Sequence, residues 1–414
     1  MLSGQSIVCF SPNRWDALWR NRQQIMSRLA QQNRVLFVEP APYLREVTAG
    51  GPRVLGVRPR VLGVRGAVHG PHLSNLRPHL NSPLPNLWVY DPPTYAPISG
   101  RRPLSDLAFA WRRASLRAVL RRLGMTHPIL WVFQYNLGEM LGHLHEQLAI
   151  YHAVDEYSAY ALNETATAEV NRQETIRQME TEVIRQVDLV FVTSPALWES
   201  KHSLHPHVVL VPNGVDYEHF ACPATEVPAD LAELPRPLAG YAGVINEKLD
   251  TVLLADIARQ HPDWTFALIG PDVLRRQRET LDALQALPNV HFLGSKTVQQ
   301  LPAYMQSCDV CLMPYRRNEW TRNISPLKLY EYLATGVPIV STPIPAAQAF
   351  AGAIWLADDA PGFGRAIAEA MTSDTPDRRR QQQALAQPHT WENRVEALSA
   401  AIQARLREPS PGET

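Results

Sequence analysis

Short apolar runs alternate with longer amphipathic segments along most of this chain. The short runs are rich in Val, Ile and Phe, and the longer segments repeat apolar residues at helical spacing. This alternation is typical of β-α-β units, in which helices cover a parallel sheet. The first half predicts strands over Ile7–Phe10, Val35–Val38, Leu87–Tyr90, Ile129–Phe133, Ala149–Ala153, Leu189–Thr193 and Val208–Val211. The second half predicts strands over Gly240–Gly243, Trp264–Ile269, Val290–Leu293, Val310–Met313 and Pro338–Ser341.

Helical segments fall between these strands. They are predicted at Asp16–Gln31, Leu104–Leu123, Glu164–Arg185, Pro195–Lys201, Leu249–Gln260, Val273–Ala286, Val298–Ser307 and Pro326–Thr335. The fold class is therefore α/β, with two Rossmann-like, doubly wound domains in succession. A ligand shared by two such domains would lie in the cleft that faces the carboxyl ends of both sheets.

A turn marks the boundary between the two domains. The segment Val211–Asp216 ends a strand and turns on Asn-Gly, and the proline-containing stretch Pro223–Pro237 follows it. We assign residues 1–212 to an N-terminal domain, residues 213–388 to a C-terminal domain and residues 389–414 to a final helix and tail. One face of that helix is apolar, which predicts that it packs back on a core: Trp391, Val395, Leu398 and Ile402.

Composition narrows the class of protein. The chain has 414 residues, and its 40 basic side chains balance 40 acidic ones, which argues against nucleic acid as a partner. Four cysteines are too few for a secreted disulfide framework, so a reducing compartment is favoured. The N-terminus does not resemble a signal peptide, and no apolar run approaches the ~20 residues of a membrane span. We expect a cytoplasmic protein, at most peripheral at the inner face of the cell membrane.

Lysine is rare among the basic residues. Arginine supplies all of them except Lys201, Lys248, Lys296 and Lys328. Because a planar guanidinium cannot replace a compact ammonium at every site, each lysine is a candidate for specific chemistry. The alternative for each is an ordinary solvated surface residue.

The segment from Asn323 to Ser341 carries the clearest site signal. Ser325 is predicted to cap a helix, Pro326 to be its first residue, and Gly336 to end it. Such a helix directs free backbone N–H groups, here those of Leu327 and Lys328, and the positive end of its dipole into the cleft. A diphosphate suits this position.

Two side chains on this helix could bind the same ligand. Lys328 places a cation in the first turn, where the helix dipole alone would favour an anion. Glu331 lies on the same face, where its carboxylate could accept hydrogen bonds from a ribose diol. The alternative is a surface Lys–Glu pair worth only ~0.2–0.5 kcal/mol.

Three segments together resemble a known family. Ser325–Ser341, Val211–Asp216 with Phe220, and the block that begins Tyr241-Ala-Gly-Val-Ile-Asn-Glu-Lys are similar to the group 1, family 4-like nucleotide-sugar glycosyltransferases of the GT-B fold. The resemblance implies a nucleoside-diphosphate-sugar donor on the C-terminal domain and an acceptor on the N-terminal domain. It also implies transfer without a metal or a further cofactor.

The resemblance assigns further donor contacts. By position, Gly243 permits close approach of the backbone and Lys248 meets the donor phosphates. Tyr315 borders the nucleobase, although it could equally be a packed loop aromatic. Many retaining members carry two glutamates eight positions apart, and Asn323 stands where the first would be. The stereochemical outcome and the donor sugar are therefore not predicted.

Asp155 is the candidate general base. It follows a predicted strand, so it should face the cleft, where a carboxylate could take the proton of an acceptor hydroxyl. The arrangement is similar to inverting GT-B enzymes that transfer glucuronic acid in exopolysaccharide assembly. The alternatives are that Asp155 caps the following helix, or that Glu156 is the base.

The N-terminal domain offers candidate acceptor contacts after its first strand. Trp15 could stack on a sugar ring, while Arg14 or Arg22 could meet an anionic acceptor. Aromatic packing at a helix start is the alternative for Trp15. The arginine-rich amphipathic segment 101–123 could contact an anionic membrane that carries a lipid-linked acceptor, or it could be a solvated helix face.

Missing motifs exclude other chemistries. The chain contains no Asp-x-Asp motif and no dinucleotide, serine-hydrolase or Walker signature. The lone Cys308-x-x-Cys311 predicts buried strand cysteines and no metal site. The resemblance to the GT-B glycosyltransferases, together with these absences, implies a metal-independent glycosyltransferase that acts on a hydroxyl of a cell-surface glycan or lipid-linked acceptor. A nucleotide-sugar epimerase and a non-catalytic nucleotide-sugar-binding subunit are the alternatives.

Overall fold

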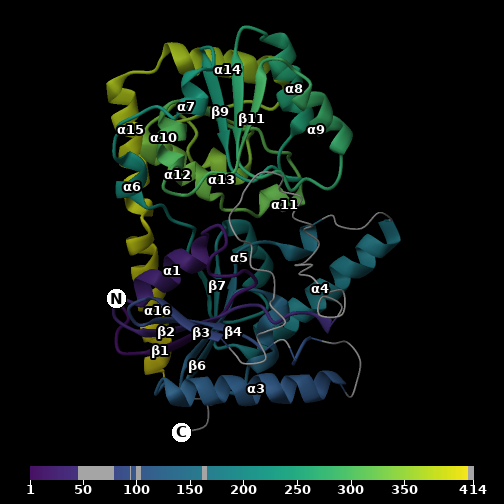
Figure 1. The fold of residues 1–414 in the computed structure, drawn as a ribbon, viewed down its shortest axis with the longest axis vertical. Helices are drawn as coiled ribbons and strands as arrows, with labels where there is room; N and C mark the ends of the chain where they lie inside the picture. Colours follow the sequence, from purple (N-terminus) through teal and green to yellow (C-terminus); the bar gives the residue numbers. More distant parts are fainter. Residues whose placement is uncertain (45–78, 94, 99–103, 161–165, 409–414) are drawn as a thin grey trace.

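The chain folds into two α/β domains, one above the other (Figure 1). The computed structural model describes residues 1–44, 79–93, 95–98, 104–160 and 166–408. The N-terminal domain is built on β1 to β8 and the C-terminal domain on β9 to β14. The fold class predicted from the sequence, two Rossmann-like domains, is confirmed. Part of the expected basic segment, 101–103, lies outside the described residues.

The N-terminal sheet has eight strands in the order β3-β4-β2-β1-β5-β6-β7-β8. All of its pairings are parallel except β3 with β4. Its strands are β1 (Ser6–Phe10), β2 (Arg34–Val38), β3 (His79–Leu84), β4 (Leu87–Asp91), β5 (Ile129–Val132), β6 (Leu148–Ala153), β7 (Leu189–Val192) and β8 (Val208–Leu210). The antiparallel edge strand β3 was not predicted, because most of its side chains are exposed and its sequence contains Asn, Ser and Pro.

The C-terminal sheet has six parallel strands in the order β11-β10-β9-β12-β13-β14. They are β9 (Leu238–Ala242), β10 (Thr265–Ile269), β11 (Val290–Gly294), β12 (Val310–Met313), β13 (Ile339–Ser341) and β14 (Trp355–Leu356). This order is the 3-2-1-4-5-6 arrangement of a doubly wound fold. In both sheets the strand order reverses beside the first strand, so each domain has a switch point there.

Helices cover the faces of both sheets. In the first half they are α1 (Asn21–Leu29), α3 (Leu104–Arg122), α4 (Ala166–Gln186) and α5 (Pro195–Lys201), with 3-10 turns η1 (Tyr135–Met140) and η2 (Tyr157–Ala159). In the second half they are α6 (Tyr217–Ala221), α7 (Ala229–Ala232), α8 (Thr251–Gln260), α9 (Arg278–Gln285), α10 (Leu301–Gln306), α11 (Glu319–Arg322), α12 (Leu327–Thr335), α13 (Pro345–Gln348), α14 (Ala360–Thr372), α15 (Pro376–Ala386), η3 (Gln387–His389) and α16 (Trp391–Arg407).

Two helices begin about five residues later than the sequence predicts. The helix expected from Asp16 begins at Asn21, because the Trp15 amide donates to the Glu39 carboxylate at 2.9 Å and holds the preceding loop. The helix expected from Val273 begins at Arg278, because the amide of Arg275 donates to Glu247 at 3.0 Å. In both places a carboxylate accepts a hydrogen bond from a backbone amide of the loop that precedes the helix.

The final helix returns to the first domain. Figure 1 shows α15 beside the C-terminal domain and α16, in yellow, beside the N-terminal domain. The predicted apolar face of α16 is fully buried, and it joins one core cluster with Phe37, Trp131 and Phe191 of the N-terminal sheet. The chain therefore crosses between the domains twice, once before β9 and once after α15.

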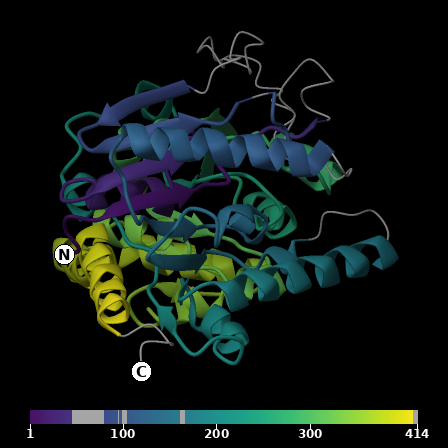
Figure 2. The same cartoon turned by 90° about the horizontal axis from the view of Figure 1, so that it is seen from below.

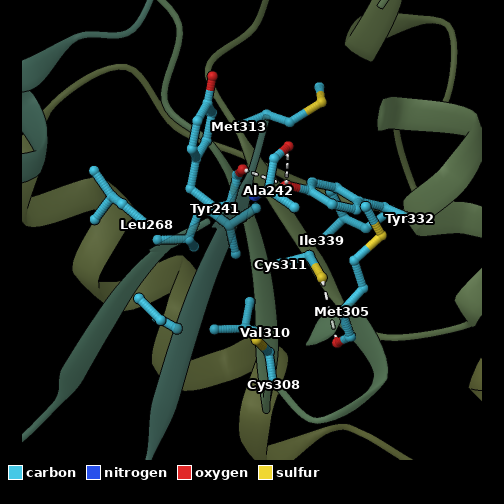
Figure 3. Close-up of a cluster of buried hydrophobic side chains, with 14 of the residues drawn as sticks. Tyr241, Ala242, Leu268, Met305, Cys308, Val310, Cys311, Met313, Tyr332 and Ile339 are labelled. Atoms are coloured by element: carbon cyan, nitrogen blue, oxygen red, sulfur yellow. Dashed lines mark hydrogen bonds between the residues drawn. The ribbon is translucent and has the colours of Figure 1, made fainter. Parts of the chain in front are cut away.

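The C-terminal core is formed where the sheet meets α10 and α12 (Figure 3). Cys308 and Cys311 lie among Met305, Val310 and Tyr332, and both cysteines are free and buried. The prediction that they are buried structural cysteines is confirmed. The Tyr332 hydroxyl lies beside the end of β9, where it accepts a hydrogen bond of 2.8 Å from the Ala242 amide. This contact ties α12 to the strand that precedes Gly243.

Candidate functional site

A cavity of about 250 Å³, open to solvent, lies between the two domains. Its walls come from the start of α1, the end of β6, the loop after β9, the loop after β12 and the start of α12. Most of the predicted site residues line it: Arg22, Asp155, Gly243, Lys248, Tyr315, Ser325, Pro326, Leu327, Lys328 and Glu331. Segments more than 300 residues apart in the chain therefore form one site.

The strand order explains why these residues meet. Gly243 follows β9, and Tyr315 follows the neighbouring strand β12, so they lie at the switch point of the C-terminal sheet. Arg22 follows β1 at the switch point of the N-terminal sheet, and Asp155 follows β6 of the same sheet. Loops separate at a switch point because the helices on its two sides cover opposite faces of the sheet.

Lys328 lies in the wall that the C-terminal domain contributes to the cavity, here called the C-terminal wall. It is 8% exposed, and its Nζ lies 3.5 Å from the ring centroid of Tyr241 and 5.1 Å from that of Tyr315. Gly243, with φ of 146°, makes room for it, because an added Cβ would lie 2.5 Å from the same Nζ. The glycine therefore serves the close approach of the lysine, and aromatic faces stabilise the ammonium.

Burial disfavours the charged forms of the ionisable side chains in this wall. Burial and the neighbouring Lys248 lower the pKa of Lys328 well below its usual value, and Glu331 opposes this shift. Burial also lowers the pKa of Lys248. Burial raises the pKa of Glu331 to about 7, although Lys328 acts in the opposite direction. Two neighbouring ammonium groups with one carboxyl group nearby form a site that an anionic ligand would stabilise.

Ser325 does not cap α12 as predicted. The N-cap position belongs to Pro326, and no side-chain hydrogen bond caps this end of the helix. Ser325 instead binds the interdomain linker, since its Oγ accepts from the Asn213 amide at 3.2 Å and its carbonyl accepts from Asn213 Nδ2 at 2.6 Å. The predicted end at Gly336, with φ of 76°, is confirmed. The first amides of α12 are thus left without a side-chain cap at the cavity.

Asp155 faces the other domain. The indole Nε1 of Trp320 donates to both of its oxygens, at 3.1 and 3.3 Å, and the Tyr160 hydroxyl donates at 2.5 Å. Trp320 belongs to α11 of the C-terminal domain, and its ring also lies 5.0 Å from Nζ of Lys248. One indole therefore connects the candidate base to a candidate phosphate-binding lysine.

Glu156 is not available as a base. Its carboxylate is buried, accepts from Lys201 Nζ at 3.1 Å and from Ser158 at 2.6 Å, and does not line the cavity. Lys201 also donates to Glu180 at 2.9 Å, and Glu180 accepts from Tyr151 at 2.7 Å. This buried network anchors the loop that carries Asp155 to α4 and α5. The alternative that Asp155 caps a helix also finds no support, because no side chain caps η2.

Two of the three predicted acceptor residues lie outside the cavity walls. Trp15 is buried and packs edge-on against Trp19 and Phe37, so its ring belongs to the N-terminal core. Arg14 forms an ion pair with Glu39 at 3.0 Å. Arg22 does line the cavity, and it is 4% exposed. Of the three, only Arg22 is retained in the site.

Sequence reasoning missed Trp320, Tyr241 and Arg20. Trp320 lies on a four-residue helix, which is too short to show a periodic pattern. Tyr241 is part of a buried strand, where an aromatic residue predicts core packing only. The Arg-x-Arg spacing of Arg20 and Arg22 at a helix start was the available signal for a second basic residue. Among the residues that the structure describes, no cluster of three or more His, Cys, Asp or Glu side chains could hold a metal ion.

Comparison with known proteins finds a family match within the second domain. Residues 236–373 match the family described as Glycosyl transferases group 1. TuaH of Bacillus subtilis, whose name assigns it to teichuronic acid biosynthesis as a glycosyltransferase, is 31% identical over 179 residues. The match includes 42% of this chain, and the chain covers 45% of that relative's length.

Solved structures share the arrangement of both domains. Sucrose-phosphate synthase from Thermosynechococcus elongatus superposes with a TM-score of 0.68 at 17% identity, covering 97% of this chain and 98% of that one. HepE from Anabaena, solved with UDP-glucose, gives a TM-score of 0.62 at 14% identity, covering 96% and 99%. Residues 236–373 of this chain are thus similar to the group 1 glycosyltransferases, and the whole chain has the GT-B fold.

Proposed function

We propose that this protein transfers a sugar from a nucleoside-diphosphate sugar to a hydroxyl group in the interdomain cavity. One observation carries the proposal: the indole of Trp320 contacts both Asp155 and Lys248. A carboxylate and a phosphate-binding cation from different domains thus lie on either side of one side chain. This arrangement suits a reaction in which the carboxylate activates a hydroxyl and the cation receives a leaving diphosphate.

The donor would lie on the C-terminal wall. Lys248, Lys328 and the first amides of α12 would bind the diphosphate, and Glu331 would accept hydrogen bonds from the ribose. Tyr315 is less suited to stack on the base, because its ring is 4% exposed and faces the Lys328 ammonium. We therefore assign Tyr315 to stabilising Lys328. No metal or further cofactor enters the proposed reaction, since these cations would neutralise the leaving group.

The reaction balances with groups of this chain. The acceptor hydroxyl loses its proton to Asp155 while its oxygen forms a bond to the anomeric carbon. The bond from that carbon to the diphosphate oxygen breaks, and the nucleoside diphosphate leaves with the electron pair. Lys248 and Lys328 stabilise the added negative charge, which is greatest in the transition state and the product.

Hydrogen bonds to Asp155 set its orientation. The indole of Trp320 and the hydroxyl of Tyr160 both donate to this carboxylate and hold it in place. Because the Trp320 hydrogen bonds cross between the domains, a change in the angle between them would remove the indole from both carboxylate oxygens. An acceptor hydroxyl could then take the place of the indole.

An activity assay with Asp155→Asn tests this proposal. The protein would be incubated with UDP-glucose and other UDP-sugars, with and without candidate acceptors, and the release of UDP measured. We expect kcat to fall about 100-fold or more, as is typical when a general base is lost, while donor KM changes less than threefold. Glu174→Gln, on the exposed part of α4, is the control and should retain full activity.

The same assay separates the alternatives. An epimerase would change the sugar of the donor without any acceptor, and a binding subunit would bind UDP but release none from the UDP-sugar. A wild-type kcat in Asp155→Asn would contradict the assignment of Asp155 as the base. Product formation that depends on an added acceptor would support transfer.

We also propose that α3 contacts an anionic membrane that presents the acceptor at its cytoplasmic face. Leu104, Leu107 and Trp111 of α3 are each more than half exposed, and Arg121 and Arg122 are exposed on the same helix. The helix lies on the outer face of the N-terminal domain, away from the cavity (Figures 1 and 2). None of the described helices has both the length and the apolar character that a bilayer crossing needs. Surface contact would rest on apolar insertion together with charge.

Sedimentation with vesicles tests the α3 contact. Wild-type protein should sediment with phosphatidylglycerol vesicles and stay in solution with phosphatidylcholine vesicles. The double variant Leu107→Glu, Trp111→Glu should lose this binding. Val170→Glu, which changes an equally exposed apolar residue on α4, should keep it. Equal binding of both variants would contradict the proposal.

A further inference from the structure

We infer that the N-terminal wall of the cavity holds a second anion-binding subsite, centred on Arg22, and that the acceptor therefore carries a carboxylate or phosphate group. This inference rests on the proposed transferase function. It assigns a chemical class to an acceptor that is otherwise defined only as a hydroxyl compound.

Arg22 is a buried cation without an acidic partner. Its side chain is 4% exposed, yet among the described residues no carboxylate lies within 4.0 Å of its guanidinium. One of its nitrogens donates to Asn13, and its guanidinium carbon lies 5.5 Å from the Phe133 ring centroid. Its Nε has no hydrogen-bond partner in the described part of the chain. Buried charges are normally paired, so this cation lacks the counter-charge that a ligand could supply.

The surroundings of Arg22 do not provide that charge. The titratable groups that interact with it are Tyr157, Tyr160, Cys9, His152 and Arg20. Burial raises the pKa of the two tyrosines and of Cys9, and it lowers the pKa of His152 to about 3, so all four are neutral at pH 7. The only charged neighbour in this set is another arginine, which lowers the pKa of Arg22 further.

The cations of the two cavity walls interact electrostatically, each with the next. Arg22 interacts with Arg20, Arg20 with Lys248, and Lys248 with Lys328. All four line the cavity. Asp155 acts on Lys248 and Glu331 on Lys328, whereas no carboxylate among the described residues lies within 4.0 Å of the Arg22 guanidinium. The N-terminal end of the series is therefore the end that most lacks negative charge.

The position of Arg22 indicates that it binds the acceptor and not the donor. It lies in the first turn of α1, whose positive end faces the cavity at the switch point of the N-terminal sheet. It also interacts with Tyr157, two residues from Asp155, so it shares a wall with the proposed base. The donor diphosphate already has two lysines and the start of α12 on the opposite wall. An anion beside Arg22 would thus belong to the molecule that presents its hydroxyl to Asp155.

Binding to UDP-saturated protein tests the subsite. With UDP filling the donor wall, the protein would be titrated by calorimetry with methyl glucuronide, inorganic phosphate and methyl glucoside. We expect one of the two anions to bind and the neutral glucoside not to bind. Binding of methyl glucuronide would identify a carboxylate acceptor, and binding of phosphate alone would identify a phosphate-linked one.

Variants locate the bound anion. Arg22→Gln should weaken anion binding about tenfold or more and change UDP affinity less than twofold, while Arg22→Lys should restore part of the loss. Arg28→Gln, later on the same helix and paired with Glu392, is the matched control and should bind as wild type does. Thermal melts of each variant confirm that it is folded.

Three results would overturn the inference. They are no anion binding by UDP-saturated wild type at tens of millimolar, undiminished binding by Arg22→Gln, or a loss of UDP affinity in Arg22→Gln that places Arg22 in the donor site. If UDP itself did not bind, the proposed function would fail. The Arg22 subsite could still be measured then, by titrating UDP-free Lys328→Gln protein with the same anions.

Discussion

The four lysines show how far single residues were predictable. Because lysine is rare in this chain, each of the four was predicted to have a specific role. Lys296 is the one that forms a partly exposed ion pair, with Asp230 at 2.7 Å. Lys248 and Lys328 line the cavity, as the resemblance implied. Lys201 is buried between two carboxylates. No local sequence pattern predicts this contact, because Glu156, Glu180 and Lys201 lie in three separate segments of the chain. Sequence spacing reveals contacts within a helix and not those between elements.

Replacing Lys201 should destabilise the fold strongly. Lys201→Met would leave Glu156 and Glu180 as buried, uncompensated carboxylates, so we expect a loss of about 3–5 kcal/mol in the free energy of unfolding. Adding Glu180→Gln should recover part of this loss. Denaturant titration measures both variants. Lys296→Met, at the more exposed pair, should cost less than about 1 kcal/mol, and a similar cost at Lys201 would argue against a buried network.

Glu331 should make stability depend on pH. Its pKa rises from 4.5 to about 7 on folding, so the folded state holds this proton more tightly than the unfolded state. The resulting stabilisation is complete below pH 4.5 and is lost as pH rises towards 7. Relative to wild type, Glu331→Gln should therefore gain about 1–3 kcal/mol between pH 5 and pH 8.

Unfolding by denaturant at several pH values measures this difference. Glu396→Gln, at an exposed position on α16, controls for the general effect of removing a carboxylate. An unchanging difference between Glu331→Gln and wild type would show that Glu331 is not held in a site that disfavours its charge.

At the scale of elements, periodic segments were predictable and short ones were not. Long helices such as α3, α4 and α16 appear close to their expected bounds, because each repeats apolar residues over several turns. The four-residue α11 and two-residue β14 have no such pattern. α11 nevertheless carries Trp320, so part of the candidate site lay in an element that periodicity cannot detect. Ser325 was misassigned for a related reason, since its partner Asn213 lies in a distant linker.

The position of α16 gives a prediction about the N-terminal domain. Leu398 is fully buried in the same core cluster as β1, β2 and β5 side chains, so Leu398→Ala should cost about 2–5 kcal/mol. Glu396→Ala, two residues away and exposed, should cost little. Hydrogen exchange measured by peptide should show faster exchange in the N-terminal domain. Faster exchange confined to β9–β14 would contradict this placement.

The two domains of the molecule share one topological feature. Each sheet reverses its order beside its first strand, and the loops at both switch points face the same cavity. The alternation of strands and helices along the sequence was sufficient to predict the two domains. It could not predict which side chains would meet across the cavity, since Trp320 and Asp155 are 165 residues apart and their contact depends on how the domains sit together.

Calorimetric titration with UDP would show whether a nucleoside diphosphate binds between the domains at Lys328. Wild type and Lys296→Gln should bind one UDP per chain with equal affinity. Lys328→Gln should keep its thermal melt and bind UDP about 100-fold more weakly or not at all, because it loses a buried cation that meets the diphosphate. Equal UDP affinity in Lys328→Gln and wild type would contradict the account.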